Sequence, residues 1–298
     1  MSTRNWFSFI LLGVTWGSTY TWTKIGVQEM SPFTLVSLRL LFASLGYLVY
    51  YWIKKPARPQ RSFLPVFFVL GLLNIFIPFV LMSWSQKYIS SGMASILNST
   101  QPLFAILLVP LFVPEDHITL PKAAGLILGF TGVVVLMWNR ASSQESGLYF
   151  IASLTTLLGA LSYAGGAIYA KRKTVGLNPD IQSIGQNLAA TVVTIPAAFL
   201  VEKSITIPTL PISWAAVVWM GLLSSFMGSL LYFSLINDVG PTRTVLVTYL
   251  VALVGVLLGI IFLNEQPGWH LFVGGGLVIG GIIMVNTKTK KERILQSG

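Results

Sequence analysis

Ten apolar runs, each about 20 residues long, follow one another along the chain with short polar connections between them. A helix of this length matches the hydrocarbon thickness of a bilayer, so the pattern predicts an all-α polytopic membrane protein with ten transmembrane helices. The first run has a counterpart in the second half, so we interpret it as a span rather than a cleaved signal peptide. The predicted spans are Trp6–Gly26, Pro32–Ile53, Phe63–Trp84, Gly92–Phe112, Leu120–Trp138, Leu148–Ala170, Ile181–Val201, Ile212–Ile236, Val245–Leu263 and Gly268–Val285.

The pattern of the first half recurs in the second half. Shifts of 147 and 150 positions align Trp16 with Tyr163, Lys24 with Lys171, Pro32 with Pro179, Gly71 with Gly221, Pro78 with Gly228 and Glu115 with Glu265. Each half holds an odd number of spans, so the second half enters the membrane from the opposite side. We therefore predict two inverted five-helix repeats, residues 1–140 and 148–287, an architecture used by secondary transporters.

Composition and charge also indicate a chain embedded in lipid. Of the 298 residues, 54% are hydrophobic and only 9% are charged, whereas soluble domains are about 25% charged. The net charge of +10 would suit nucleic acid, but with the N-terminus inside most of the 19 Lys and Arg residues fall in cytoplasmic segments. The outer segments then hold Lys24, Lys87, Arg140 and Lys203. We expect a multi-pass protein of the inner (plasma) membrane with both termini cytoplasmic and no nucleic-acid partner.

Motifs for catalysis or metal binding are absent from the sequence. There is no cysteine, which excludes disulfides and thiolate metal sites. No phosphate-binding loop, metal-ligand spacing or nucleophile motif occurs, so we expect neither an enzyme nor a bound cofactor or metal. The nine carboxylates lie at span ends or in loops, so an intramembrane proton relay is not indicated. Glu115 and Glu265 are equivalent positions on opposite faces, where they either cap helices or act as gates.

The third and eighth spans are equivalent, and both carry helix-breaking residues. Pro78 and Gly228 are matched positions, and Asn74 and Ser224 lie one turn before them. Proline removes a backbone donor, glycine loosens a helix, and helices broken at matching positions border the pathway of inverted-repeat transporters. Such residues are also common in membrane helices. Their matching positions nevertheless favour two flexible helices that line a substrate pathway.

One face of the first span combines aromatic and hydroxyl side chains. Trp16, Thr19 and Tyr20 fall on this face, and Tyr163 of the sixth span is equivalent to Trp16. Aromatic walls with nearby hydroxyls suit an organic molecule that has an apolar body and a few polar atoms. We predict that these four residues line the pathway, with ordinary helix packing as the alternative.

Further polar positions lie inside the spans. Asn98 is equivalent to Thr248, and we place both on the pathway, with an interhelical hydrogen bond as the alternative. Arg39 is the one cation clearly inside a span, where it either snorkels to the outer interface or contacts a substrate carboxylate. Pro102 follows Asn98 in the fourth span but has Ala252 as its counterpart, so the two halves should kink differently.

Small residues recur in the fifth and tenth spans. Gly125 and Gly129 are four residues apart and Gly132 follows, while Gly276 and Gly280 are four residues apart with Gly281 beside them. This spacing lets helix backbones approach closely. We expect packing within a monomer, with a weak homodimer as the alternative.

Taken together, these residues resemble the EamA type of the drug/metabolite transporter superfamily over nearly the whole chain. The marks are Trp16-Gly17-Ser18 followed by Lys24, Arg39, Ala94 and Pro102, Glu115 followed by Gly125 and Gly132, and Glu265 followed by Gly274 and Gly281. The resemblance implies ten helices, with the fifth and tenth peripheral and the others around a central cavity. It also implies export of small metabolites, often amino acids, or of toxic compounds.

We therefore expect a membrane transporter that exports small organic metabolites, such as amino acids, related compounds or drugs, by alternating access. Its expected partners are a small-molecule substrate and the lipid bilayer. A passive channel, a lipid translocase or a ligand-binding membrane receptor is the alternative.

Overall fold

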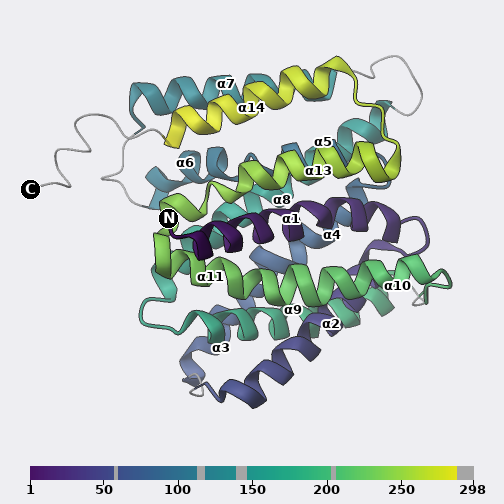
Figure 1. Cartoon of the computed structure of the whole chain (residues 1–298), viewed down its shortest axis with the longest axis vertical. Helices are drawn as coiled ribbons and strands as arrows, with labels where there is room; N and C mark the ends of the chain where they lie inside the picture. The colour runs from purple at the N-terminus through teal and green to yellow at the C-terminus, as the bar shows by residue number, and fades with distance from the viewer. Residues whose placement is uncertain (57–59, 113–117, 139–145, 203–205, 287–298) are drawn as a thin grey trace, which may run out of the picture.

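The computed structural model describes residues 1–56, 60–112, 118–138, 146–202 and 206–286, and no β-strand occurs among them (Figure 1). The first half contains α1 Thr3–Gly26, α2 Pro32–Lys54, η1 Arg61–Phe63, α3 Leu64–Gly71, η2 Leu72–Phe76, α4 Ile77–Ser85, α5 Ser91–Asn98, α6 Gln101–Phe112 and α7 Leu120–Met137. The second half contains α8 Ser146–Lys173, α9 Pro179–Glu202, α10 Pro211–Val218, η4 Trp219–Met227, α11 Gly228–Val239, α12 Pro241–Thr244, α13 Val247–Leu263 and α14 Trp269–Asn286.

The helices begin where the sequence supplies suitable starting residues. Pro32, Pro179 and Pro211 each open a helix, a position where the missing N–H of proline costs no hydrogen bond. The Ser90 side chain accepts a hydrogen bond of 3.1 Å from the Met93 N–H and so caps α5. Every predicted span therefore coincides with helical structure, and its ends differ from the prediction by only a few residues.

Eight helical segments of the described chain are long and apolar enough to cross a membrane. Two predicted spans are not among them. One is α1, which has 24 residues but is rich in Thr and Ser, and the other is α13, which has only 17 residues. The structure thus supports a polytopic membrane protein, while the count of ten spans stays a prediction.

The third and eighth predicted spans are both interrupted by π-helix, at aligned positions. In η2 and η4 each hydrogen bond closes one residue later than in an α-helix, which bulges the chain. Pro78 follows η2 within the first turn of α4, and Gly228 is the first residue of α11 after η4. The predicted breakers therefore stand directly beside irregular helix in both halves.

The fourth and ninth spans differ, as Pro102 and its counterpart Ala252 predict. The fourth span breaks between α5 and α6, and the hydroxyl of Thr100 donates a hydrogen bond of 2.6 Å to the Leu97 carbonyl oxygen there. Pro102 has no N–H to donate to the Asn98 carbonyl oxygen four residues earlier, and its ring crowds that carbonyl, which explains a break directly after Asn98. In the ninth span α13 continues unbroken through Ala252.

Helices α7 and α14 lie side by side at one edge of the molecule (Figure 1). A Cβ on Gly132 would lie 2.6 Å from the carbonyl oxygen of Gly274, and one on Gly274 would lie 2.8 Å from that of Gly132. The expected packing within the monomer is therefore present. Of the small residues predicted in α14, Gly281 faces α7, where a Cβ would lie 2.6 Å from the Gly125 carbonyl oxygen. Gly276 has nothing within 4 Å and Gly280 approaches only Leu128 at 3.5 Å, so these two were predicted wrongly.

Aligned glycines make equivalent contacts around α2 and α9. A Cβ on Gly71 would lie 2.7 Å from the Gln186 carbonyl oxygen of α9, and one on Gly221 would lie 2.7 Å from the Arg39 carbonyl oxygen of α2. Arg39 and Gln186 are themselves aligned positions. The bulged third span therefore packs closely on α9, and the bulged eighth span packs closely on α2. Each of these partners is the second long helix of the opposite half.

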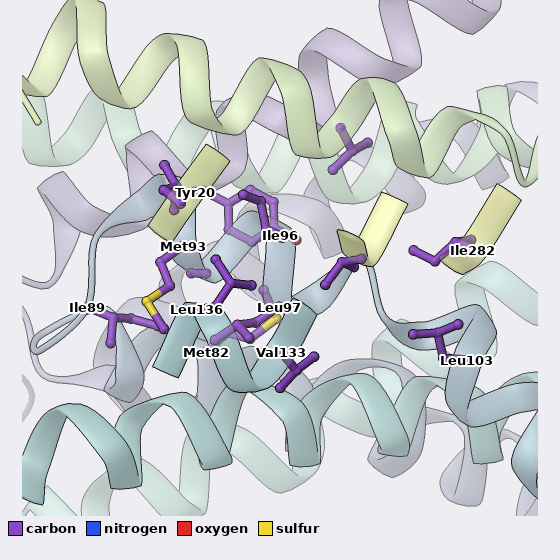
Figure 2. Packing of buried hydrophobic residues seen from close by; sticks show 14 of the residues in the cluster. Tyr20, Met82, Ile89, Met93, Ile96, Leu97, Leu103, Val133, Leu136 and Ile282 are labelled. Atoms are coloured by element: carbon purple, nitrogen blue, oxygen red, sulfur yellow. The ribbon is translucent and has the colours of Figure 1, made fainter. Parts of the chain in front are cut away.

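The largest buried cluster joins the helices that surround α5. Figure 2 shows Tyr20 of α1 beside Met93 and Ile96 of α5, with Leu136 of α7 in the same cluster. Because α1 lies between α13 and α11 and also contacts α5, its polar face is enclosed by other helices (Figure 1).

Candidate functional site

The indole of Trp16 joins α1 to the π-helical segment η4. Its Nε1–H donates a hydrogen bond of 2.9 Å to the Ser224 carbonyl oxygen, and the Ser224 hydroxyl donates one of 2.9 Å to the Thr15 carbonyl oxygen. Trp16 also packs directly against Gly228, where a Cβ would collide with the ring. The Tyr232 ring lies 5.2 Å from the Trp16 ring between centroids. The structure thus brings together three predicted site residues, Trp16, Ser224 and Gly228.

Helix α8 holds η2 in the way that α1 holds η4. The Ser162 hydroxyl donates a hydrogen bond of 2.7 Å to the Leu73 carbonyl oxygen inside η2. Asn74 donates through Nδ2 to Oε1 of Gln186 at 3.4 Å, and Pro78 packs beside Gly159. A bulged helix leaves carbonyl groups without their usual partners, and side chains of a neighbouring helix satisfy them here.

Tyr20 and Asn98 form a buried pair between α1 and α5. Asn98 donates through Nδ2 to the Tyr20 hydroxyl oxygen at 2.6 Å, so it makes an interhelical hydrogen bond, and its pathway role stays a prediction. The remaining oxygen of Asn98, Oδ1, is enclosed and has no hydrogen-bond partner among the described residues. Tyr163 interacts electrostatically with Tyr20, so the pair lies next to the equivalent aromatic residue of α8.

Arg39 is buried inside the protein. Its Nε–H donates a hydrogen bond of 2.8 Å to the Ser225 hydroxyl oxygen, and its guanidinium carbon lies 3.8 Å from the centroid of the Phe79 ring. Only 8% of the residue is exposed, so the snorkelling interpretation is wrong. The cation turns toward η4 and α4, and it interacts electrostatically with Tyr20 and Tyr163.

Among the described residues, the hydroxyls of two predicted pathway residues, Thr19 and Thr248, bond the backbone three or four positions earlier. The Thr19 hydroxyl donates to the Thr15 carbonyl oxygen at 3.2 Å, and the Thr248 hydroxyl donates to the Val245 carbonyl oxygen at 2.8 Å. Sequence reasoning missed Phe79, Ser162 and Ser225. The one available signal was that Ser225 and Phe79 adjoin the matched positions 224 and 78.

One end of the bundle, which we call the Glu265 end, comprises residues 24–34, 85–92, 202 with 206–211, and 263–269. Here Glu265 accepts hydrogen bonds from the Ser91 N–H at 2.7 Å and the Gly92 N–H at 3.3 Å, at the start of α5. Lys24 donates to the carbonyl oxygens of Gln86 at 2.6 Å and Ile89 at 2.9 Å, just after α4. A carboxylate at a helix N-terminus and a cation near a C-terminus both match the helix dipole.

Two more carboxylates join helices at the Glu265 end. Glu202 accepts from the N–H groups of Phe33 at 2.8 Å and Thr34 at 3.1 Å, at the start of α2. Glu29 accepts from the Leu210 N–H at 3.1 Å and from the Thr209 hydroxyl, just before α10. Hydrogen bonds from Ser213 and Thr209 lower the pKa of Glu29 to about 2, so this carboxylate is ionised at neutral pH.

The opposite end, which we call the Asp180 end, comprises residues 50–56, 60–61, 173–180, 238–249 and 286. There the Tyr50 hydroxyl donates to Asp180 at 2.7 Å, and Asn286 donates to the Tyr249 hydroxyl at 3.2 Å. Neither of the carboxylates described at this end, Asp180 or Asp238, accepts a hydrogen bond from the start of another helix. The predicted counterpart of Glu265, Glu115, lies outside the described residues.

The site offers hydrogen-bonding and aromatic groups and one buried cation. In the part of the chain that the structure describes, no three His, Asp or Glu residues are grouped so that they could hold a metal ion. The arrangement of aromatic rings, hydroxyls and a cation is of the kind that recognises an organic molecule.

Comparisons with known proteins agree over nearly the full length. An uncharacterized transporter of Archaeoglobus fulgidus is 28% identical, covering 96% of this chain and 99% of its own. A probable terminal-alkyne amino-acid exporter of Streptantibioticus cattleyicolor is 23% identical over 96% and 95%. The uncharacterized inner membrane transporter YedA of Escherichia coli K12 is 26% identical over 92% and 88%.

A solved structure shares the fold, and a family model matches both halves. The solved structure, titled only as a protein crystal structure, has a TM-score of 0.65 at 18% identity and covers 99% of this chain and 100% of its own. The model of the EamA-like transporter family matches residues 5–138 and again residues 150–287. The chain therefore belongs to the EamA-like transporter family.

Proposed function

We propose that this protein exports small organic metabolites, such as amino acids, related compounds or drugs, by alternating access. It would do so as ten spans in two inverted repeats, residues 1–140 and 148–287, in the inner membrane with both termini cytoplasmic. The inner-membrane transporter and the amino-acid exporter among its relatives support this proposal. The family match supports transport rather than catalysis.

The observation that carries the mechanism is the pair of aligned π-helical segments. Trp16 of α1 bonds the backbone of η4, and Ser162 of α8 bonds the backbone of η2. Irregular helix is tolerated inside a membrane where neighbouring side chains satisfy the backbone. Each bulge can shift its bonding pattern at small cost, so the two segments are suited to bend in turn as the pathway opens to one side and then the other.

The contacts at the two ends of the bundle differ, and this difference supports a state in which the pathway is closed at the Glu265 end. At the Glu265 end, Glu29, Glu202 and Glu265 each bond the start of a helix from the other half, and Lys24 bonds the segment after α4. At the Asp180 end, Asp180 bonds the phenol of Tyr50 and Asn286 bonds the phenol of Tyr249, so the contacts named there are neutral or phenolic. Alternating access requires that the ionic contacts of the Glu265 end break when that side opens.

The proposal is tested by transport in proteoliposomes that contain the purified protein. We expect saturable uptake or release of at least one compound from a panel of amino acids and organic cations, and none in protein-free liposomes. Flux that never saturates would indicate a channel, and movement of lipid headgroups would indicate a translocase. Ligand binding without any flux would indicate a receptor and would contradict export.

A further inference from the structure

Arg39 is a buried cation whose outer nitrogens have no partner. Its Nε bonds Ser225, but no hydrogen bond joins Nη1 or Nη2 to a described residue. Among the described residues, the side-chain polar atoms that are both fully enclosed and unpartnered are those of Thr21, Ser37, Gln86 and Asn98. The two outer nitrogens of Arg39 are unpartnered but not in this group, so each retains some accessible surface. Arg39 is also the one charged side chain that is buried among the described residues.

No carboxylate in the described part of the chain balances this charge. Tyr20 and Tyr163 are the titratable side chains close enough to influence the charge of Arg39, and the face of its guanidinium is covered by Phe79. A buried charge without a counter-charge is costly, and ionisable residues inside membrane spans usually pair with one another or with a ligand. The contact with Phe79 offsets part of that cost but leaves the N–H groups at the edge of the guanidinium unused.

The hydroxyls beside Arg39 are also available as donors. The Tyr163 hydroxyl makes no hydrogen bond with a described residue, and it too retains accessible surface. The Tyr20 hydroxyl accepts a hydrogen bond from Asn98, which leaves its own proton free to be donated. Two guanidinium nitrogens and two hydroxyls, drawn from α1, α2 and α8, thus each have an N–H or O–H group available to donate.

We propose that Arg39, Tyr20 and Tyr163 form a binding site for the carboxylate of an organic substrate, and that this site makes the protein selective for carboxylates over cations. The planar guanidinium presents paired N–H groups that match the two oxygens of a carboxylate, and the phenols can donate to the same oxygens. This inference rests on the proposed function. It names the chemical class of the substrate.

The test measures ligand stabilisation of the purified full chain by thermal unfolding. The ligands are L-amino acids, each paired with its carboxamide, together with tetraphenylphosphonium. A ligand that binds the folded state raises the unfolding temperature. We expect at least one amino acid to stabilise the protein, with its carboxamide roughly 10- to 100-fold weaker, because a charge-assisted contact is lost.

Variants of Arg39 test whether this residue causes the preference for a carboxylate over its carboxamide. We expect Arg39→Gln to weaken carboxylate binding roughly 10- to 100-fold and to abolish the difference from the carboxamide. Arg39→Lys should restore part of the preference, because it keeps the charge but not the paired geometry. Ser44→Ala is the matched control on the same helix, since Ser44 bonds Asn187 and Thr191 of α9, and it should keep the full preference.

A second variant covers the case in which Arg39→Gln fails to fold. Tyr163→Phe removes one unpaired hydroxyl and should weaken carboxylate binding about 2- to 10-fold without changing carboxamide binding. Three outcomes would each contradict the carboxylate site. They are equal binding of carboxylates and carboxamides, a preference for tetraphenylphosphonium, and stabilisation by no carboxylate. Saturable flux of a cation that Arg39→Gln leaves unchanged would overturn the site while export stands. Carboxylate binding through Arg39 without flux would overturn export alone.

Discussion

At the scale of a single residue, we propose that Trp16 connects substrate recognition with movement of the helices. Its ring lies beside Tyr232 and Gly228, while its Nε1–H holds a carbonyl oxygen of the irregular segment η4. Because the Trp16 side chain both packs on Gly228 and bonds the backbone of η4, a change in the hydrogen bonding of η4 would move it. Trp16 is therefore the residue at which binding of a substrate would most directly affect η4.

Replacing Trp16 should weaken substrate binding without unfolding the protein. We expect Trp16→Ala to lower the apparent affinity about 10-fold, because both the aromatic wall and the bond to Ser224 are lost. Titration of the best ligand from the stabilisation panel measures the affinity, and circular dichroism measures the fold. Trp269→Ala is the control, since that ring is 63% exposed at a helix end. Unchanged affinity in folded Trp16→Ala would remove Trp16 from the site.

Glu29 makes stability depend on pH in a defined direction. Its pKa falls from 4.5 to about 2 because Ser213 and Thr209 donate to the charged carboxylate. A lowered pKa means that the contribution to stability is complete above the ordinary pKa and is lost as the pH falls toward 2. The unfolding temperature of Glu29→Gln should therefore lie below that of the wild type at pH 7. The two values should converge on acidification, and a constant difference down to the lowest pH would contradict this role.

The matched residue pairs could be predicted from the sequence, but the direction of Arg39 could not. Alignment of the halves suffices to find Asn74 with Ser224 and Pro78 with Gly228, since it needs only spacing. Arg39 has a long flexible side chain that can reach either an interface or an interior. Its direction depends on Phe79 and Ser225, which come near it only after three helices have packed.

At the scale of whole elements, the contact between α7 and α14 depends on two glycines of α14 rather than on a regular spacing. Gly274 and Gly281 face the backbone of α7, whereas Gly276, which belongs to the predicted four-residue pattern, faces open space. Spacing along one helix cannot reveal which side meets the partner, because that choice depends on how both helices are rotated.

Alanine substitutions on α14 test this assignment. In Gly274→Ala the new Cβ would lie 2.7 Å from Leu136 and 2.8 Å from the Gly132 carbonyl oxygen, so we expect a loss of about 1–3 kcal/mol in the free energy of unfolding. Gly276→Ala on the same helix meets nothing within 4 Å and should be neutral or slightly stabilising. Thermal unfolding in detergent measures both, and equal effects would argue against the contact.

The carboxylates of the Glu265 end act on whole helices, because each bonds the start of one. We expect Glu265→Gln to lower the stability of the closed state by about 0.5–2 kcal/mol, since the N-terminus of α5 loses its negative charge. The measurement is the unfolding temperature at low and high salt, where screening should reduce the difference from the wild type. Asp238→Asn is the control, because Asp238 is exposed and makes no hydrogen bond with a described residue. A difference that does not change with salt would contradict an electrostatic role.

The sequence predicts where the third and eighth spans are irregular, but it does not predict that the irregular segments are π-helical. Pro78 and Gly228 indicate where the third and eighth spans are irregular, but the π-helical bonding precedes them over Leu72–Phe76 and Trp219–Met227. A bulge persists only when other helices satisfy its spare carbonyls. Ser162 and Trp16 provide those bonds from distant parts of the sequence, so a local pattern cannot specify the bulge.

The whole molecule gives the sharpest test of the inverted architecture. Gln28 and Val175 are related by the shift of 147 that aligns the two halves, and both are exposed. Gln28 lies in the connection between α1 and α2 at the Glu265 end, and Val175 lies between α8 and α9 at the Asp180 end. If the repeats are inverted across a membrane, these equivalent residues face opposite compartments.

The chain has no cysteine of its own, so a single introduced cysteine reports one position without any background mutation. In intact spheroplasts we expect a membrane-impermeant maleimide to label Gln28→Cys, and to label Val175→Cys only after permeabilisation, because the charge distribution places the α8–α9 connection in the cytoplasm. Ile207→Cys, at the Glu265 end but in the second half, is the control and should behave like Gln28→Cys. Labelling of Gln28→Cys and Val175→Cys from the same side would refute inversion. The reverse of the expected pattern would keep inversion and exchange the two faces, which would place both termini outside.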